Sequence, residues 1–165
     1  MSNFLEELVA EWYDYQGYFV KRNIKVGKLA VGGYESELDV VAFNPNTKHL
    51  VHIEPSTDAH SWEQREIRYT KKFNAGKAYI PTIFAGFSDL PEPEQIALLV
   101  VAGRTSQKEL GGGKVVHILD FLTQIVNHFT GVSILKSAIS EQYMLLRMVQ
   151  FMVHFKKDLF ESVVE

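Results

Sequence analysis

The stretch "ELDVVAFNPNTKHLVHIEPST" (residues 37–57) places two apolar runs on either side of a short turn, and each run carries an acidic residue. The connection "NPNT" is rich in turn-forming residues, and so short a link predicts an antiparallel hairpin. Side chains alternate across a strand, so Glu37 and Asp39 share one face of the first strand. By the same rule His52, Glu54 and Ser56 share one face of the second. The hairpin therefore predicts that Asp39 and Glu54 meet on one face of a sheet.

The segments around this hairpin alternate between helical and strand-like patterns. Apolar residues at helical spacing predict a first helix over residues 4–16, with Ser2 or Asn3 as its N-cap and Gly17 as its C-cap. Further helices are predicted at residues 58–78 and 120–131, and strands at 18–27, 78–87, 96–103 and 115–119, with a flexible loop at 107–114. This order predicts an α/β fold in which helices flank a central mixed sheet.

The composition of the chain narrows its class. At 165 residues and 46% hydrophobic composition, we expect a single domain, 1–165, with a core over about 4–130 and a helical extension over about 134–162. The absence of cysteine excludes disulfides and thiolate metal sites, and we expect a cytoplasmic protein without a signal peptide. A net charge of -3 gives no overall attraction to nucleic acid, so binding of a polyanion would need a local basic patch.

Two carboxylates on one sheet face have a specific chemical use. Mg²⁺ binds oxygen ligands and commonly takes one or two carboxylates together with waters. Such a metal can activate water and neutralise the charge that develops on a phosphodiester. An equally supported interpretation is that Asp39 and Glu54 face an edge of the sheet or pair with basic residues.

The segment "GYESELDVVAFNPNTKHLVHIEPST" resembles the core of the PD-(D/E)XK nuclease superfamily, which has the restriction-endonuclease-like fold. In that family an Asp on one strand and an E-x-K on the next hold the metal and the attacking water. The resemblance places Asp39 and Glu54 in these two positions and spans about residues 4 to 86. It also suggests that Glu6, or Glu7 beside it, supplies the acidic residue of the family's first helix as a further metal ligand.

The family's lysine is missing, because the motif reads Glu54, Pro55, Ser56. A serine hydroxyl can hydrogen-bond but carries no positive charge, and Pro55 suggests that the strand ends or bulges there. Either the site is degenerate or a basic residue elsewhere replaces the lysine, and Lys72 or Arg68 on the following predicted helix is our candidate. A basic group on that helix also suggests phosphate contacts, or else a solvated helix face: Arg65, Arg68, Lys71 and Lys72.

The histidines suggest a rival metal site. His49, His52 and His60 flank Glu54, and a His/Glu set can bind zinc. Their spacings match no strong zinc pattern, and His49 and His52 fall on opposite faces of the strand. A zinc site is therefore the weaker hypothesis.

The final segment, "SEQYMLLRMVQFMVHFKKDLFESVV" (residues 140–164), reads as a helix that is apolar around most of its circumference. A narrow polar stripe is formed by Arg147, Gln150, His154, Lys157 and Glu161. The segment is too interrupted to span a membrane, so we expect it to be buried, either against its own domain or in a homodimer.

These patterns lead to two main functional hypotheses and to a third, weaker one, an obligate oligomer whose helix pairing is its main role. The first is a Mg²⁺- or Mn²⁺-dependent endonuclease that hydrolyses DNA, with Asp39, Glu54 and Glu6 as metal ligands and with Ser56, Lys72 or Arg68 near the reaction. The second is a non-catalytic nuclease-fold module that binds nucleic acid or a protein partner. The missing lysine favours the second hypothesis, and the two retained acids favour the first.

Overall fold

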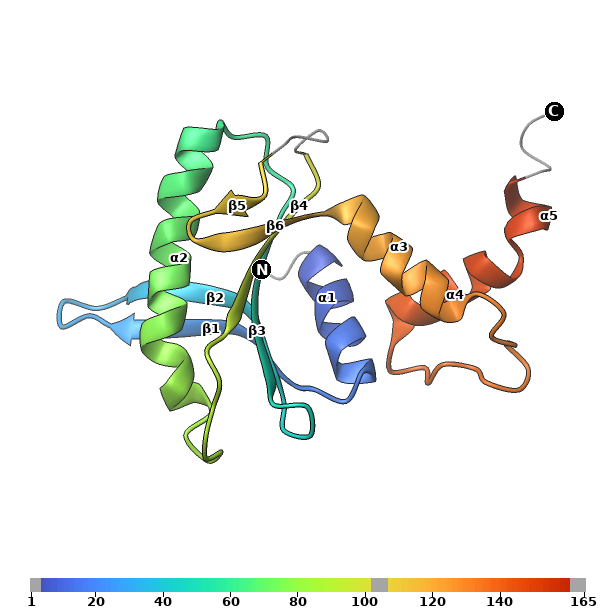
Figure 1. The fold of residues 1–165 in the computed structure, drawn as a ribbon, viewed down its shortest axis with the longest axis horizontal. Helices are drawn as coiled ribbons and strands as arrows, with labels where there is room; N and C mark the ends of the chain where they lie inside the picture. The colour runs from blue at the N-terminus through green and yellow to red at the C-terminus, as the bar shows by residue number, and fades with distance from the viewer. Residues whose placement is uncertain (1–3, 102–106, 161–165) are drawn as a thin grey trace. The chain divides into compact units, whose positions relative to one another are not determined.

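The computed structural model describes residues 4–101 and 107–160. The chain divides into two compact units, residues 1–118 and 119–165, which we describe separately. The elements of the first unit are α1 (Phe4–Tyr15), β1 (Phe19–Lys28), β2 (Tyr34–Asn44), β3 (His49–Ser56), α2 (Trp62–Ile83), β4 (Glu94–Leu99), β5 (Glu109–Leu110) and β6 (Gly113–His117) (Figure 1). The remaining helices are α3 (Ile118–Phe129), α4 (Met144–His154) and α5 (Lys156–Phe160).

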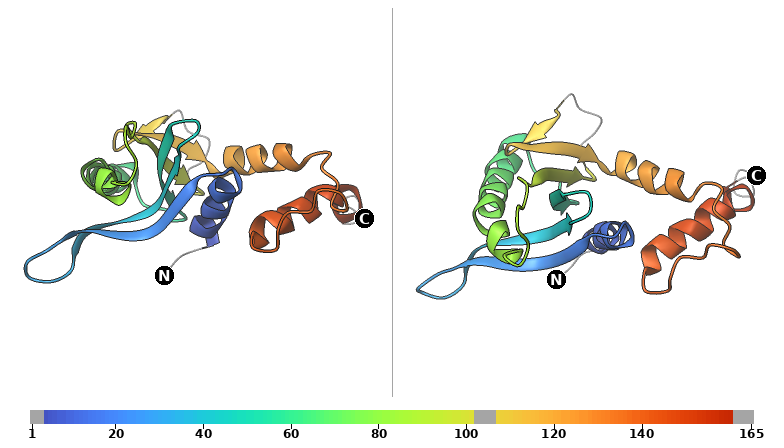
Figure 2. Two further views of the ribbon diagram at one scale, coloured as in Figure 1. Left: turned by 90° about the horizontal axis from the view of Figure 1, so that it is seen from below. Right: turned by 60° about the horizontal axis from the view of Figure 1, so that its bottom comes forward.

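Across the described residues, six strands form one open mixed sheet in the order β1-β2-β3-β4-β6-β5. The strands β1, β2 and β3 pair antiparallel, β3, β4 and β6 pair parallel, and β5 returns antiparallel to β6. Helix α1 packs against β1, β2 and β3 on one face, and α2 lies across the other face (Figure 2). The mixed α/β class predicted from the sequence is confirmed.

The hairpin of β2 and β3 forms as predicted. Its register runs from Asn44↔His49 at the turn to Val40↔Ile53. The side chain of Asn44 accepts hydrogen bonds from the backbone N–H groups of Asn46 and Thr47, which closes the turn in the way that asparagine favours.

The helix α2 is longer than predicted, and the strand predicted at residues 78–87 is wrong. The side chain of Ser61 caps the helix by accepting from Gln64 N. Its buried face then continues through Phe73, Gly76 and Ile80, at helical spacing. Gly76 and Pro81 do not stop the helix, because burial of this face against β1 and β2 outweighs their low helix propensity.

The segment predicted as a loop at residues 107–114 contains a tight β-hairpin. Gly111 and Gly112 both have positive φ, 59° and 80°, and join Leu110 to its partner Gly113. Adjacent left-handed residues are what a two-residue hairpin turn requires, and glycine adopts them without strain. Parts of three other predictions, the N-cap at residues 2–3, the strand end at 102–103 and Glu161 of the polar stripe, lie outside the described residues.

The second unit corrects the prediction of one continuous C-terminal helix, because α4 ends at His154 and α5 starts at Lys156. The polar stripe is also not solvated throughout: Gln150 is buried and bonds Ile139 N and Ser137 O, and Arg147 donates to Ile139 O. The exposed side chains of α4 and α5 include Met144, Met148, Phe151, Met152 and Leu159. The burial predicted for this apolar face, against its own domain or in a homodimer, therefore stays a prediction.

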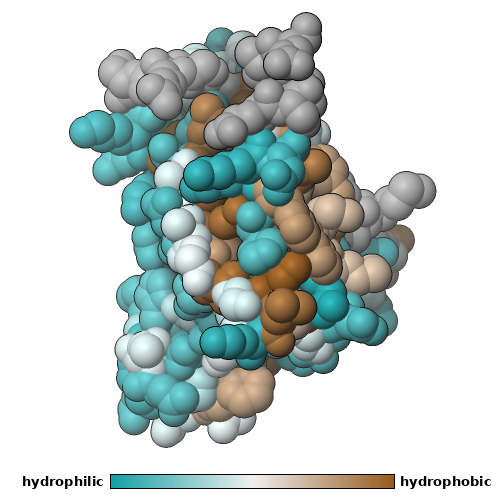
Figure 3. All heavy atoms as spheres, turned by 90° about the vertical axis from the view of Figure 1, so that its right-hand side faces the viewer, coloured by the Kyte–Doolittle hydropathy of each residue, from teal (hydrophilic) through white to brown (hydrophobic). Residues whose placement is uncertain are grey.

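Figure 3 shows apolar side chains gathered at the surface on one face of the molecule. No helix in residues 4–101 and 107–160 is long and apolar enough to cross a membrane.

Candidate active site

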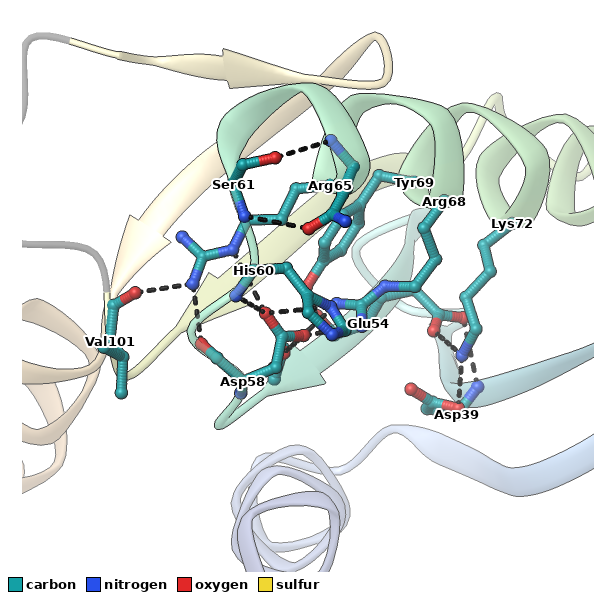
Figure 4. A network of polar contacts seen from close by, with 12 residues as sticks. Asp39, Glu54, Asp58, His60, Ser61, Arg65, Arg68, Tyr69, Lys72 and Val101 are labelled. Carbon is teal, nitrogen blue, oxygen red and sulfur yellow. Dashed lines mark hydrogen bonds and ion pairs between the residues drawn. The ribbon is translucent and has the colours of Figure 1, made fainter.

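Asp39 and Glu54 lie together and share one cation. The ammonium of Lys72 donates to Asp39 Oδ1 at 2.7 Å and to Glu54 Oε2 (Figure 4). Their side chains are largely removed from solvent, with exposed fractions of 15% for Asp39, 2% for Glu54 and 23% for Lys72. The predicted meeting of the two carboxylates on one face is confirmed, and a lysine from α2 joins them there.

The register of the hairpin explains why these carboxylates meet. Pairing between β2 and β3 stops at Val40↔Ile53, so Asp39 and Glu54 would form the next opposed pair. With no strand partner at that point, the backbone N–H of Asp39 donates instead to Glu54 Oε1 at 3.1 Å. The end of the antiparallel ladder therefore supplies a donor that holds the Glu54 carboxylate in place.

His52 provides a second fixed donor to Glu54. Its Nε2 lies 2.7 Å from Glu54 Oε1, and its Nδ1 lies 3.4 Å from Gln95 Nε2, which can only donate. Burial, followed by the positive charge of Lys72, lowers the pKa of His52 to about 3. His52 is therefore neutral, with Nε2–H as donor and Nδ1 as acceptor. Gly76 makes room for this ring, since a Cβ there would lie 2.3 Å from His52 Nδ1.

Tyr69 fixes the backbone of the same strand. Its hydroxyl donates to the carbonyl oxygen of Glu54 at 3.1 Å, and the ring is buried at 1% exposure. Burial raises the pKa of Tyr69 to about 12, against the opposing effect of Arg68, so the hydroxyl keeps its proton. Both the side chain and the carbonyl of Glu54 are thus held by buried donors.

The electrostatics of the three charged groups are coupled. Burial raises the pKa of Asp39 to about 7, and the adjacent Glu54 carboxylate adds to this effect while Lys72 opposes it. For Lys72, burial lowers the pKa, but Glu54 and Asp39 outweigh it, so the pKa lies above its ordinary value. Lys72 therefore stays charged, and Asp39 carries a proton for part of the time near neutral pH.

A second polar network adjoins this site through Ser56 (Figure 4). Asp58 receives bonds from the Ser56 hydroxyl and the backbone N–H of His60, and it pairs with Arg65 and Arg68. Burial alone would raise the pKa of Asp58, but the Ser56 hydroxyl, the backbone N–H of His60 and Arg68 hold it well below its usual range. Asp58 therefore stays charged and anchors both arginines.

A small pocket opens at the junction of the two networks. Its volume is about 100 Å³, and it is lined by Asp39, Glu54, Pro55, Ser56, Arg68, Tyr69 and Lys72. It is large enough for a small cation or one anionic group.

Pro55 does not end or bulge the strand, contrary to our prediction. Strand β3 continues to Ser56, and Pro55 pairs in register with Leu98 of β4. Because β2 no longer pairs with β3 beyond Ile53, this part of β3 has a free edge, which is where a sheet tolerates proline.

The structure places the other predicted residues differently. Glu6 is buried on α1, on the sheet face opposite α2 (Figure 2), and Lys71 is exposed on α2. Arg65 is buried at 3% exposure and donates to the carbonyl oxygens of Asp58 and Val101. Its contacts therefore hold two backbone segments together and do not present the guanidinium to a phosphate.

Within residues 4–101 and 107–160, no three His, Asp or Glu side chains gather as a metal cluster. Glu6 therefore does not complete a three-residue set with Asp39 and Glu54. The rival histidine set does not assemble either, since His49 bonds Tyr18 and Glu94 instead.

Sequence reasoning missed Asp58, Tyr69 and Gln95 as parts of this site. Asp58 continues the two-residue alternation of Glu54 and Ser56 beyond the strand, and that spacing was a usable signal. The contacts of Tyr69 and Gln95 depend on how α2 and β4 pack on β3, which has no counterpart in local sequence.

Comparison of the chain with protein-family models, with curated proteins and with solved structures found no match.

Proposed function

We propose that the protein is a divalent-metal-dependent nuclease that hydrolyses phosphodiester bonds of DNA. The observation that carries this proposal is the ammonium of Lys72 held between the carboxylates of Asp39 and Glu54. Two carboxylates and one lysine are the groups that the nuclease motif combines, and here the lysine comes from α2 instead of the position of Ser56.

The donor set fits a hard divalent cation. Asp39 and Glu54 already hold one positive charge, and all of their ligand atoms are carboxylate oxygens, which Mg²⁺ and Mn²⁺ prefer. Two protein carboxylates are sufficient, because Mg²⁺ usually keeps several waters. When bound, the metal would supply an activated water and neutralise charge on the phosphate.

The residues of the chain would divide the remaining tasks. Asp39 and Glu54 would hold the cation, and His52 and Asp39 N would keep the Glu54 carboxylate oriented. Lys72 would move from the two carboxylates to the negative charge that develops on the phosphoryl oxygens. A cationic donor beside this developing charge is typically worth 10²- to 10³-fold in rate, or about 3–4 kcal/mol.

The resemblance to the PD-(D/E)XK superfamily and its restriction-endonuclease-like fold supports the same proposal. The order of a helix, an antiparallel three-stranded meander, a second helix and a parallel fourth strand is compatible with that fold. The two residues that the resemblance assigns to the motif, Asp39 and Glu54, lie on adjacent strands, and their carboxylates share the ammonium of Lys72.

A second candidate function is a non-catalytic module that binds nucleic acid or a protein partner. The same Lys72 contact favours it in a different way, because an ammonium between two carboxylates already balances part of their charge without a metal. In that case the three residues would form a buried structural network of two ion pairs that share Lys72.

Titration of Mg²⁺ and Mn²⁺ with supercoiled plasmid DNA separates these functions. We expect the wild-type protein to nick or linearise the plasmid in a metal-dependent way, and Asp39→Asn to lose this activity. Metal binding by calorimetry without any cleavage would favour the non-catalytic module. Cleavage that survives both Asp39→Asn and Glu54→Gln would contradict the proposal, because no metal–carboxylate site could then be responsible.

A further inference from the structure

The guanidinium of Arg68 is held in an unusually defined position beside the candidate active site. Its NH1 lies 2.5 Å from Asp58 Oδ2, and its NH2 donates to Ser56 Oγ at 3.1 Å. The carbon at the centre of the guanidinium lies 5.0 Å from the centre of the Tyr69 ring, within cation–π range. These three contacts together hold the guanidinium in place.

The groups that hold Arg68 are themselves anchored. Asp58 also accepts from the buried Arg65, with Nε 3.2 Å from Oδ1, and Arg65 ties the Asp58 carbonyl to the Val101 carbonyl. Arg65 is thus a support for Asp58, while Arg68 lies one turn further along the same helix and nearer to Lys72. Figure 4 shows this chain of contacts running from Arg65 through Asp58 to Arg68.

Arg68 remains accessible in spite of these contacts. Its side chain is 37% exposed and lines the pocket that also contains Lys72 and both carboxylates. A guanidinium has five N–H donors, and the contacts to Asp58 and Ser56 use two of them. The fork of an arginine matches the oxygens of a phosphate group, which it can bind through two parallel hydrogen bonds.

We infer that Arg68, positioned by Asp58 and Ser56, forms a phosphate-binding subsite for a nucleic-acid backbone phosphate next to the Asp39–Glu54–Lys72 site. The inference rests on the proposed function and names the part of the substrate that this pocket holds. A pocket of about 100 Å³ admits a phosphate group, and the arginine fork would bind its oxygens rather than the edge of a base. Recognition here is therefore independent of base identity.

Charge balance makes this subsite dependent on the metal. The two networks contain three acids, Asp39, Glu54 and Asp58, and three bases, Arg65, Arg68 and Lys72. Without a divalent cation the carboxylates offset the attraction of Arg68 for an anion. A bound cation adds two positive charges, so phosphate should bind more tightly in its presence.

The test measures binding separately from cleavage. Fluorescence anisotropy of a fluorescein-labelled 20-base-pair DNA duplex is recorded with and without Ca²⁺, and a gel confirms that the probe stays intact. Ca²⁺ shares the preference for oxygen ligands but takes longer, looser bonds. We expect Ca²⁺ to tighten binding by the wild type and Arg68→Ala to weaken binding in Ca²⁺ by about 10- to 100-fold. Arg68→Ala should also reduce the slope of log affinity against log salt by about 1.

Two further variants test whether the geometry of the Arg68 guanidinium matters or only its positive charge. Arg68→Lys keeps the charge but loses the fork, so we expect its affinity to fall nearly as far as that of Arg68→Ala. Lys114→Ala removes one positive charge from an exposed side chain on β6 and should change affinity by less than about twofold. Equal losses in Lys114→Ala and Arg68→Ala, or no loss in Arg68→Ala, would overturn the inference.

The positioning role of Asp58 needs its own comparison. Asp58→Asn should weaken binding several-fold in the wild-type background and have no further effect in Arg68→Ala. Tighter binding by Asp58→Asn would show that Asp58 competes with phosphate instead, and would overturn the positioning role. If Asp58→Asn does not fold, Ser56→Ala tests the second contact and should act in the same direction. If Arg68→Ala weakens DNA binding but the wild type does not cleave DNA in Mg²⁺, the proposed nuclease function is refuted and the phosphate subsite stands. If the wild type cleaves DNA but Arg68→Ala binds DNA as tightly as the wild type, the subsite is refuted and the nuclease function stands.

Discussion

A glutamate, a histidine and a lysine meet at each end of strand β3, but one group is buried and the other is exposed to solvent. At its C-terminal end Glu54 contacts His52 and Lys72, and at its N-terminal end Glu94 of β4 contacts His49 and Lys114. In the first group the exposed fractions of the side chains are 2% for Glu54, 0% for His52 and 23% for Lys72. In the second group they are 41% for Glu94, 40% for His49 and 64% for Lys114.

The difference shows that burial, and not residue type, distinguishes the candidate site. Solvent screens the contacts of Glu94, and such exposed pairs typically contribute about 0–1 kcal/mol. Around Glu54 the effective dielectric is lower, so charges interact more strongly and shift one another's pKa.

The largest expected effect is on catalysis. Lys72→Met removes the positive charge beside the reaction but keeps much of the side-chain volume, so we expect the rate of plasmid cleavage to fall about 10²- to 10³-fold. The same variant frees the two carboxylates from their resident ammonium, so its affinity for Mn²⁺, measured by calorimetry, should rise.

Lys114→Met is the matched control at the exposed end and should leave both cleavage and metal affinity unchanged. An equal loss of cleavage in Lys114→Met would contradict the distinction between the two ends. Weaker metal binding in Lys72→Met would contradict the idea that Lys72 and the metal occupy the same place.

The pH dependence of stability should show two opposing contributions from the buried end. Asp39, with a pKa of about 7 when folded and 3.8 when unfolded, holds a proton between these values only in the folded state. Its contribution to the free energy of unfolding therefore falls as pH rises from about 4 to 7. His52, with a pKa of about 3 when folded and 6.5 when unfolded, does the reverse, so its contribution rises from about pH 3 to 6.5.

Urea titrations of single variants should separate these contributions. Asp39→Asn leaves the His52 contribution, so stability should increase with pH between 4 and 6.5, by up to about 1.4 kcal/mol per pH unit relative to the wild type. His52→Gln should show the opposite slope. His49→Gln at the exposed end should follow the wild type, and a wild-type slope retained in both Asp39→Asn and His52→Gln would refute this linkage.

A smaller effect concerns the packing of α2 on β3. Gly76→Ala places a methyl group 2.3 Å from His52 Nδ1, so the helix or the ring must shift. We expect the free energy of unfolding to fall by about 1–3 kcal/mol. Gly86→Ala, where a Cβ meets no atom within 4 Å, is the control and should stay within about 0.5 kcal/mol of the wild type in the same thermal or urea denaturation. Equal stability of the two variants would show that the close approach at Gly76 relaxes without cost.

The smallest expected effect is at the exposed end itself. Glu94→Gln removes the contacts to His49 and Lys114, and we expect a loss of less than about 1 kcal/mol, further reduced by salt. A loss of several kcal/mol would mean that exposure does not weaken these contacts and that the comparison of the two ends fails.

The sequence predicted the part of the fold that depends on local pattern. Alternating apolar residues and the turn around Asn44 are enough to define the hairpin and to place Asp39 opposite Glu54. The pattern failed at Gly76 and Pro81, which suggested the end of a helix that in fact continues to Ile83. Its continuation depends on burial of Ile80 and Phe84 against Phe43, a contact between distant segments.

The candidate site was predictable to a similar degree. Spacing on α2 selected Lys72 and Arg68 as replacements for the missing lysine, and the structure separates them: Lys72 contacts the carboxylates, while Arg68 contacts Asp58 and Ser56. Spacing could not show this, because the distance of each side chain from β3 depends on how deeply α2 packs. Gly76 sets that depth by admitting the ring of His52.

The most direct test of the proposed metal-dependent site is an anomalous difference map from crystals soaked in Mn²⁺. We predict a single strong peak at roughly 2.1 Å from the carboxylate oxygens of both Asp39 and Glu54, the bond length typical of small octahedral cations. Lys72 Nζ should have moved away from both oxygens, and Asp39→Asn crystals should lack the peak. A map without a peak at this position, in which Lys72 keeps its contacts to Asp39 and Glu54 at high Mn²⁺, would contradict the account.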